Sequence, residues 1–226
     1  MTRRYKQNRL RFALKHVEWT PEDWARVIWT DETKINRISS DGREVVWVEN
    51  GSGLSERTIT PTVKFGGGNI MVWGCMTWSG PGKIELVQGR MNAQQYTEIL
   101  TKNLVPVIDA MSLLPDSPAR DKIILQQDND PKHTAKLAKA WFKAHNITPL
   151  EWPANSPDLN PIEHLWNTLK RRLHTYSTQP KGAQELWERV QVEWERLPTD
   201  TCKGLIESMP RRCAAVIRAK GGNTKY

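Results

Sequence analysis

The stretch KIILQQDNDPKHTAKLAKAWFKAHNITPLEW, residues 122–152, gives the clearest indication of the fold class. Its first part, KIILQQD (122–128), is an apolar run with polar neighbours and predicts a strand. The segment 133–145 has the spacing of an amphipathic helix, and ITPLEW (147–152) predicts a short further strand. Strands that alternate with helices are typical of α/β folds, so we expect a mixed α/β domain.

Further strands are predicted upstream. RVIWTDE (26–32) is a short apolar run that ends in acids, which is the pattern of a buried strand. IMVWGCMTW (70–78) and KIELVQG (83–89) are β-rich runs separated by the turn signal SGPG. REVVWV (43–48) looks like part of a hairpin, and the Gly-, Ser- and Thr-rich residues 49–69 are expected to be largely loop.

Helices are predicted before, between and after these strands. The segment 9–24 is helical at first and then breaks at Thr20-Pro21, where a new helix is expected to begin. Residues 92–114 predict a helix, and 160–174 predict another that begins near Asn160. Residues 182–197 and 200–219 predict two more, which gives a helical C-terminal end.

Length and composition exclude several classes of protein. A chain of 226 residues can bury one sizeable core but not two domains of ordinary size. No apolar run approaches the roughly 18 residues of a membrane-spanning helix, and the basic N-terminus lacks the apolar segment of a secretory signal. Cys75, Cys202 and Cys213 offer neither a disulfide framework nor a zinc pattern, which suits a reducing compartment.

The positive charge lies at the two ends of the chain. Residues 1–16 contain six Lys and Arg and no acid, and residues 203–226 contain six against one acid. The remaining residues therefore carry a net charge of −3 within the total of +8. Basic ends around a mildly acidic body indicate contact with a polyanion such as nucleic acid, although basic termini also serve solubility alone.

Three carboxylates stand in unusual positions. Asp31 follows an apolar strand, Asp128 closes another, and Glu163 sits early in a helix. A carboxylate near a core is costly unless it is paired or binds a cation. Oxygen ligands suit Mg²⁺ or Mn²⁺, and two such ions about 3.5–4 Å apart promote phosphoryl transfer. The residues therefore suggest metal-dependent chemistry on a phosphodiester.

Each carboxylate also has a structural explanation. Asp31 can simply end its strand, and Asp128 can form an ordinary Asx turn. Glu163 can close a capping box in which Asn160 is the N-cap and Pro161 the first helical residue. The local sequence alone leaves both explanations open.

Four segments in order resemble the catalytic domain of the mariner superfamily of DNA transposases, and specifically its Tc-like branch. Thirty-four residues separate Asp128 from Glu163, which is the spacing of this branch. The resemblance extends from about residue 9 to 175. The matching segments are WTPEDWARVIWTDETK (19–34), VKFGGGNIMVWGCMT (63–77), IILQQDNDPKHTA (123–135) and WPANSPDLNPIEHLWNTLKRRL (152–173).

The resemblance implies a ribonuclease H-like fold, a mixed sheet flanked by helices. Asp31, Asp128 and Glu163 would be the catalytic Asp-Asp-Glu triad and would bind two divalent ions, Mg²⁺ or Mn²⁺. The implied domains are a basic linker or helix (1–25), the catalytic domain (26–175) and C-terminal helices (176–226). A clamp loop inserted at about 37–68 would reach a partner subunit and make a homodimer.

The implied activity is cut-and-paste transposition. A metal-activated water would cleave a transposon end, and the freed 3′-hydroxyl would attack target DNA at a TA dinucleotide. DNA is the expected partner, with no membrane and no small-molecule cofactor, and the expected location in a eukaryote is the nucleus.

Several basic or polar residues are weaker candidates for DNA contact. His133 follows Asp128 by five residues and would orient phosphate or support the metal site, or else face solvent. Lys170, Arg171 and Arg172 lie two turns beyond Glu163 and would hold the DNA backbone, or else form a solvated basic helix end. Arg3 and Arg4 of the basic N-terminus complete the set of expected DNA contacts.

Transposases of this branch carry helix-turn-helix modules upstream of the catalytic domain, and the residues before Asp31 leave no room for them. A catalytic fragment, a degenerate copy or a host-adopted protein would each fit this pattern. The alternatives to a transposase are a non-catalytic DNA-binding or dimerising derivative, an inactive truncated copy, and a ribonuclease of the same fold. The ribonuclease would lack the clamp-loop and SPDLNPIE signatures.

Overall fold

The computed structural model of the chain describes residues 1–37, 68–113 and 118–226. The predicted hairpin at 43–48, nearly all of the loop at 49–69 and all but the ends of the predicted clamp loop (37–68) lie outside the described residues. No helix in the described ranges is long and apolar enough to cross a membrane.

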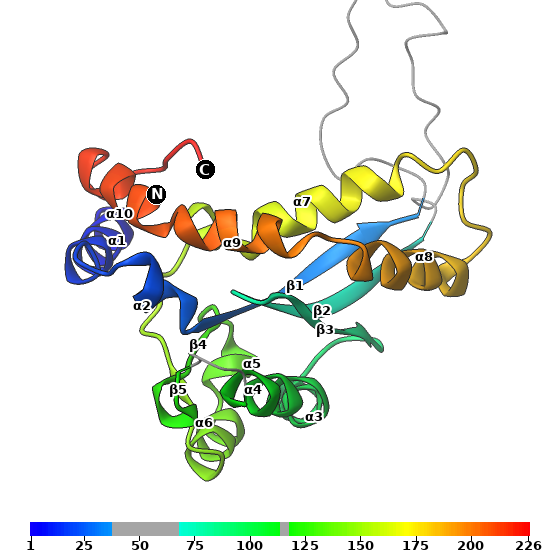
Figure 1. Ribbon diagram of the computed structural model, residues 1–226, viewed down its shortest axis with the longest axis horizontal. Coiled ribbons are helices and arrows are strands. Elements are labelled where there is room, and N and C mark those ends of the chain that lie inside the picture. The colour runs from blue at the N-terminus through cyan, green and yellow to red at the C-terminus, as the bar shows by residue number, and fades with distance from the viewer. Residues whose placement is uncertain (38–67, 114–117) are drawn as a thin grey trace, which may run out of the picture.

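A five-stranded mixed sheet forms the centre of the fold, in the order β3-β2-β1-β4-β5 (Figure 1). The predicted mixed α/β architecture is therefore confirmed. β1 pairs antiparallel with β2, β2 pairs antiparallel with β3, and β4 runs parallel to both β1 and β5. The strands are β1 (Val27–Asn36), β2 (Asn69–Thr77), β3 (Gly80–Val87), β4 (Ile124–Gln126) and β5 (Thr148–Pro149).

Two strand ends differ from the prediction in ways that affect the site. β1 does not end at Asp31, because its pairing with β2 continues as far as Asn36. Asp31 therefore stands in the middle of a strand. β4 is shorter than predicted because only Ile124–Gln126 is a strand, and Asp128 follows two residues later.

One face of the sheet is covered by helices from the middle of the chain. Successive residues of a strand point to opposite faces, and accordingly Ile28 and Leu125 belong to this side whereas Val27 and Trp29 belong to the other. The covering elements are α3 (Ala93–Ile99), the π-helical segment η3 (Leu100–Leu104), α4 (Val105–Ser112), α5 (Pro131–Thr134) and α6 (Lys136–Ala144).

The other face is covered by helices from the two ends of the chain (Figure 1). These helices contribute side chains to the same buried cluster as the sheet. α1 packs against α10, and α2 packs against α9. The elements are α1 (Arg3–Lys15), α2 (Pro21–Ala25), the 3₁₀ turn at Pro157–Leu159, α7 (Ile162–Leu173), α8 (Ala183–Glu195), α9 (Thr199–Glu207) and α10 (Met209–Arg218). A further 3₁₀ turn, Arg120–Lys122, packs against α4 on the first face.

The helix predictions are confirmed in type, and three helices are interrupted. The helix over 92–114 changes to a π-helical turn just before Pro106, which has no N–H for the continuing ladder. The helix over 133–145 begins earlier, at Pro131, and is divided by the extended backbone of Ala135. The helix over 200–219 is divided at Ser208, two residues before Pro210 in the first turn of α10.

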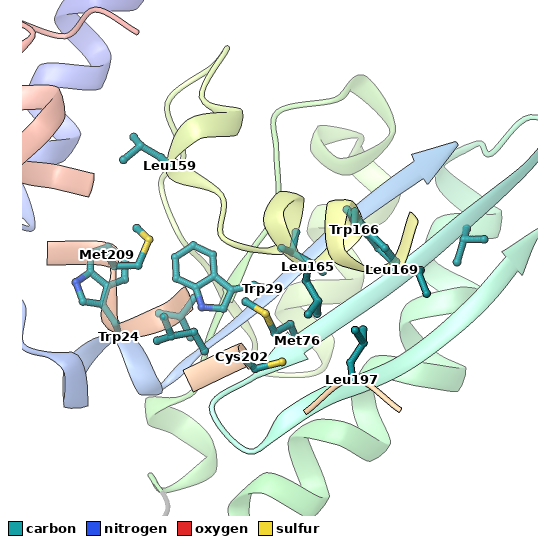
Figure 2. Close-up of a cluster of buried hydrophobic side chains, with 14 of the residues drawn as sticks. Trp24, Trp29, Met76, Leu159, Leu165, Trp166, Leu169, Leu197, Cys202 and Met209 are labelled. Carbon is teal, nitrogen blue, oxygen red and sulfur yellow. The ribbon is translucent and has the colours of Figure 1, made fainter. Parts of the chain in front are cut away.

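Gly74 allows α7 to lie close to the sheet. It pairs with Asp31 across the β1–β2 ladder, and the ring of Trp166 lies directly over it. Figure 2 shows Leu165, Trp166 and Leu169 of α7 lying over these strands. Because Glu163 stands one turn before Trp166, this contact fixes how close Glu163 comes to Asp31.

Replacing Gly74 with alanine is expected to lower the free energy of unfolding by about 1–3 kcal/mol, which is the usual cost of overpacking. The added methyl would lie 2.6 Å from the Trp166 ring and 3.0 Å from Ile84. Urea denaturation measures the effect. The matched control is Gly204→Ala in α9, where nothing lies within 4 Å and a gain of about 0.5–1 kcal/mol is expected. Equal effects of the two substitutions would contradict the packing argument.

Candidate active site

The three predicted carboxylates lie around one pocket. Asp31, Asp128 and Glu163 all line a cavity of about 350 Å³. Asp31 and Asp128 come together because β1 and β4 are parallel neighbours, and Glu163 reaches them from the first turn of α7. The structure therefore brings together residues that are as much as 132 positions apart in the sequence.

The electrostatics of this pocket disfavour carboxylates without a cation. Burial raises the pKa of Asp31 well above its usual range, and the negative charges of Glu163 and Glu32 raise it further. Burial also raises the pKa of Glu163, although a hydrogen bond with Asp31 opposes the rise. A bound cation would offset the burial of these two acids and the repulsion at Asp31, so the donor chemistry fits a divalent cation.

The geometry fits ions that take only part of their ligands from the protein. Within the described ranges, no group of three His, Cys, Asp or Glu side chains converges on a point that would hold an ion. Mg²⁺ usually binds through one or two carboxylates and completes its shell with water and substrate phosphate. The all-oxygen carboxylate set suits such a hard cation.

His133 holds Asp128 in place through a hydrogen bond. Its ring is buried, with Nδ1 2.6 Å from an oxygen of Asp128 and Nε2 3.1 Å from an oxygen of Glu32. Burial lowers the pKa of His133, but the two carboxylates outweigh this and raise it to about 9. At neutral pH the ring is thus an imidazolium that donates both hydrogen bonds. The alternative of a ring in solvent is wrong because the ring is buried, and the ring positions Asp128. Contact of His133 with DNA remains a prediction.

The pKa of Asp128 is held below its usual range. Burial would raise it, but hydrogen bonds from His133 and from the backbone of Asp130 outweigh that effect. The bond from the Asp130 N–H, at 3.0 Å, is the Asx turn that the sequence left open. Asp128 forms this turn and also lines the pocket, so the Asx turn does not exclude a role in the site.

Asn160 is a member of the site that the sequence prediction assigned to helix capping. The N-cap of α7 is Pro161, and no side chain caps the helix, so the capping box proposed for Glu163 is wrong. Instead, the Asn160 side-chain amide donates to Asp31 at 3.2 Å. Its carbonyl oxygen is buried at the pocket and has no hydrogen-bond partner. Asn160 therefore orients Asp31 and keeps an acceptor available to a bound group.

Glu32 was also missed. It adjoins Asp31, and its carboxylate accepts from His133 and pairs with Lys132 at 3.2 Å. The sequence signal was the acidic pair at 31–32, but its partners lie about one hundred residues further along the chain. Only the fold brings them together.

The basic candidates at the end of α7 have different surroundings. Arg172 donates to the carbonyl of Arg196 at 3.0 Å and lies 3.6 Å from Glu193, so it ties α7 to α8. Arg171 is exposed and donates to Thr168 on its own helix. The positive charge of Lys170 opposes part of the rise in the pKa of Glu163 that burial causes. DNA contact by these residues remains a prediction.

Arg3 and Arg4 are exposed on the first turn of α1. Neither lines the pocket that holds the three carboxylates. Their contact with DNA likewise remains a prediction.

The fold and the site together define a class of protein, the endonucleases that use an Asp-Asp-Glu set on a ribonuclease H-like sheet. Residues 26–186 match the family model described as DDE superfamily endonuclease. The chain belongs to this family and is a transposase-type catalytic domain within it.

Named relatives support the family assignment. The chain is 40% identical to the Tcb1 transposase of Caenorhabditis briggsae over 96% of its own length and 77% of the relative. It is 39% identical to the Tc1 transposase of Caenorhabditis elegans over its whole length and 80% of the relative. Against the Tc3 transposase of C. elegans the identity is 31%, and the match covers 98% of this chain and 64% of that protein.

Solved structures confirm the fold. The catalytic domain of Mos1 transposase with raltegravir and Mg superposes with a TM-score of 0.76 at 16% identity, over all of this chain and 99% of that one. A Mos1 transposase paired-end complex with the left transposon end gives a TM-score of 0.82 at 18% identity. This chain spans about 65% of the Mos1 chain in that complex.

Proposed function

We propose that the chain catalyses divalent-metal-dependent cleavage and strand transfer of DNA, as in cut-and-paste transposition. The observation that carries the proposal is the convergence of Asp31, Asp128 and Glu163 on one pocket. Burial and neighbouring acids disfavour the charged form of Asp31 there, and burial disfavours that of Glu163. The transposases among the relatives and the structures of Mos1 with Mg and Mn support it.

The three carboxylates would divide the work of holding two ions, Mg²⁺ or Mn²⁺. Asp31 and Asp128 would ligate the ions, and Glu163 would complete the shell of one of them. When bound, such ions supply activation of the attacking oxygen and stabilisation of the leaving oxygen. His133 keeps Asp128 ionised and oriented, and Asn160 orients Asp31. Phosphoryl transfer needs little more from the protein than this positioning and charge.

DNA as the partner is part of the proposal. The basic N-terminal helix and the DNA in the Mos1 complexes support it. A homodimer formed through the clamp loop at about 37–68, insertion at TA dinucleotides and a nuclear location in a eukaryote are further parts of the same proposal.

Strand joining tests the proposed function. A DNA duplex with a free 3′-hydroxyl at the end of an inverted repeat is incubated with target plasmid, the protein and Mn²⁺, and the junctions are sequenced. The expected result is joining at TA dinucleotides by the wild type and none by Asp128→Ala. DNA binding that depends on salt but ignores metal, without any joining, would instead identify a non-catalytic derivative.

A further inference from the structure

A second cavity adjoins the catalytic pocket on the side of α1. It has a volume of about 390 Å³, and the two cavities share a wall made by Asn129 and by residues 152–154. The Asn129 side chain donates to the carbonyl of Trp152 at 2.7 Å, which ties the start of the α5 turn to the chain that leaves β5. A strand that passes through the catalytic pocket can therefore continue over this wall into the second cavity.

One face of α1 supplies the opposite side of this cavity. Asn8, Arg11 and Lys15 line it, at the spacings of three and four residues that share a helix face. Arg4 lies one turn earlier on the same face. The helix thus presents cations and one amide along the cavity, which is the arrangement that tracks a phosphate backbone.

The inner part of the cavity is aromatic. Phe12 and Trp152 both line it, and their rings meet edge to face with centroids 5.1 Å apart. Both side chains are buried core residues, so they form an apolar floor, and the cations of α1 above it match the anionic phosphate of a nucleotide.

Arg9 holds α1 against residues 155–158, which line the catalytic pocket or lie beside it. This buried guanidinium makes two hydrogen bonds to Asp158, at 2.7 and 2.6 Å, and one to the carbonyl of Asn155 at 3.2 Å. Because residues 155–158 lead directly into α7, the cationic face of α1 keeps a fixed position relative to Glu163.

We propose that this α1 cavity holds the nucleotide next to the scissile phosphodiester, with Arg11 and Lys15 on its phosphate. The inference rests on the proposed function and adds where the DNA strand lies. Glu151, on the rim, pairs with Lys15 at 2.8 Å, and both side chains are exposed. A bound phosphate would take the place of Glu151, so this acid acts against DNA binding.

Fluorescence anisotropy tests the proposal with a short fluorescein-labelled DNA duplex in EDTA, where cleavage does not interfere. The double variant Arg11→Gln, Lys15→Gln is expected to bind roughly tenfold more weakly or worse near 0.1 M salt, and its log–log salt slope should fall by about 0.9 per lost contact. Glu151→Gln should bind more tightly than wild type. Lys6→Gln removes an exposed cation from the same helix but outside the cavity, and should change neither quantity.

A crosslink locates the contact. All three native cysteines are buried, so Lys15→Cys introduces an accessible thiol. This variant should form a disulfide with DNA whose backbone carries a tethered mixed disulfide, by thiol–disulfide exchange that releases the small thiol, and Lys6→Cys should not. Equal crosslinking by both, or wild-type affinity in the double variant, would overturn the proposal. Both assays omit metal and measure binding alone. If they contradict the α1 site while the wild type still cleaves DNA, only the α1 site is lost. If they support the α1 site but the wild type does not cleave DNA, the result counts against the proposed function.

Discussion

Replacing Asp31 with asparagine is expected to abolish DNA cleavage and to raise the melting temperature of the metal-free protein. Loss of one of the three carboxylates that would hold the metal should slow cleavage by about 1000-fold or more, since metal binding supplies several kcal/mol to the transition state. The gain in stability follows from the raised pKa of Asp31, which is caused by burial and by the charges of Glu163 and Glu32.

The sign of the stability effect follows from linkage. A carboxyl group whose pKa is higher in the folded state costs stability above its unfolded pKa, and that cost disappears as the pH falls through the folded value. At neutral pH the wild type bears the cost, and Asp31→Asn does not. The difference in melting temperature should therefore shrink on acidification. A gain of about 1 kcal/mol corresponds to roughly 2–4 °C for a domain of this size.

Bound metal should make the wild type more stable than Asp31→Asn. Mn²⁺ at about one hundred times its Kd would stabilise the wild type by about 2.7 kcal/mol, and Asp31→Asn should show little or no such shift. Asp130→Asn is the matched control, because Asp130 caps α5 outside the pocket and asparagine caps equally well. A metal shift that persists in Asp31→Asn and equals that of Asp130→Asn would contradict the assignment of Asp31.

Asp158→Ala is expected to cost about 3–5 kcal/mol of stability, which is typical when one partner of a buried ion pair is removed. Arg9 is fully buried and is bonded to Asp158 through both terminal nitrogens. Its remaining hydrogen bonds go to the carbonyls of Asn155, Gly221 and Gly222, so every N–H of the guanidinium has an acceptor. Without the aspartate, a charge would be left unpaired in the core.

The Arg9–Asp158 ion pair should also make the free energy of unfolding depend on pH. Burial alone would raise the pKa of Asp158, but hydrogen bonds from Arg9 and Thr224 hold it below its usual range. The stabilisation is fully present above the unfolded pKa of about 4 and is lost as the pH falls through the lower folded value. Urea denaturation at several pH values measures it.

Two variants make the ion-pair prediction specific. Lys102→Gln breaks the more exposed pair with Glu85 and should cost under about 1 kcal/mol. The double variant Arg9→Met, Asp158→Ala should cost far less than the sum of the single changes, because no charge is then left without a partner. Additive losses, or an Asp158→Ala effect as small as that of Lys102→Gln, would refute the role of the pair.

The sequence predicted the fold where the signal is local. The apolar runs before Asp31 and Asp128 became the neighbouring strands β1 and β4. Thr20 caps α2 with a full capping box, at the break that the sequence indicated. Hydrophobic periodicity and capping residues act over a few positions, so they can be interpreted without the fold.

The sequence could not predict contacts that the fold creates between distant segments. Arg9 looked like one more surface cation of a basic end, although it pairs with a residue 149 positions away. The cap signal at Asn160 was misleading because its side-chain amide donates instead to Asp31, in the distant strand β1. The triad itself came from the resemblance to a family, since each of its members also has an ordinary local explanation.

Nicking of supercoiled plasmid DNA tests the central claim most directly. Wild-type protein is predicted to convert the plasmid to the open circular form in Mn²⁺ or Mg²⁺ but not in EDTA. Asp128→Ala, shown to be folded by its melting transition, is predicted to leave the plasmid supercoiled under every condition. Equal nicking by the two proteins, or nicking by the wild type that continues unchanged in EDTA, would contradict the account.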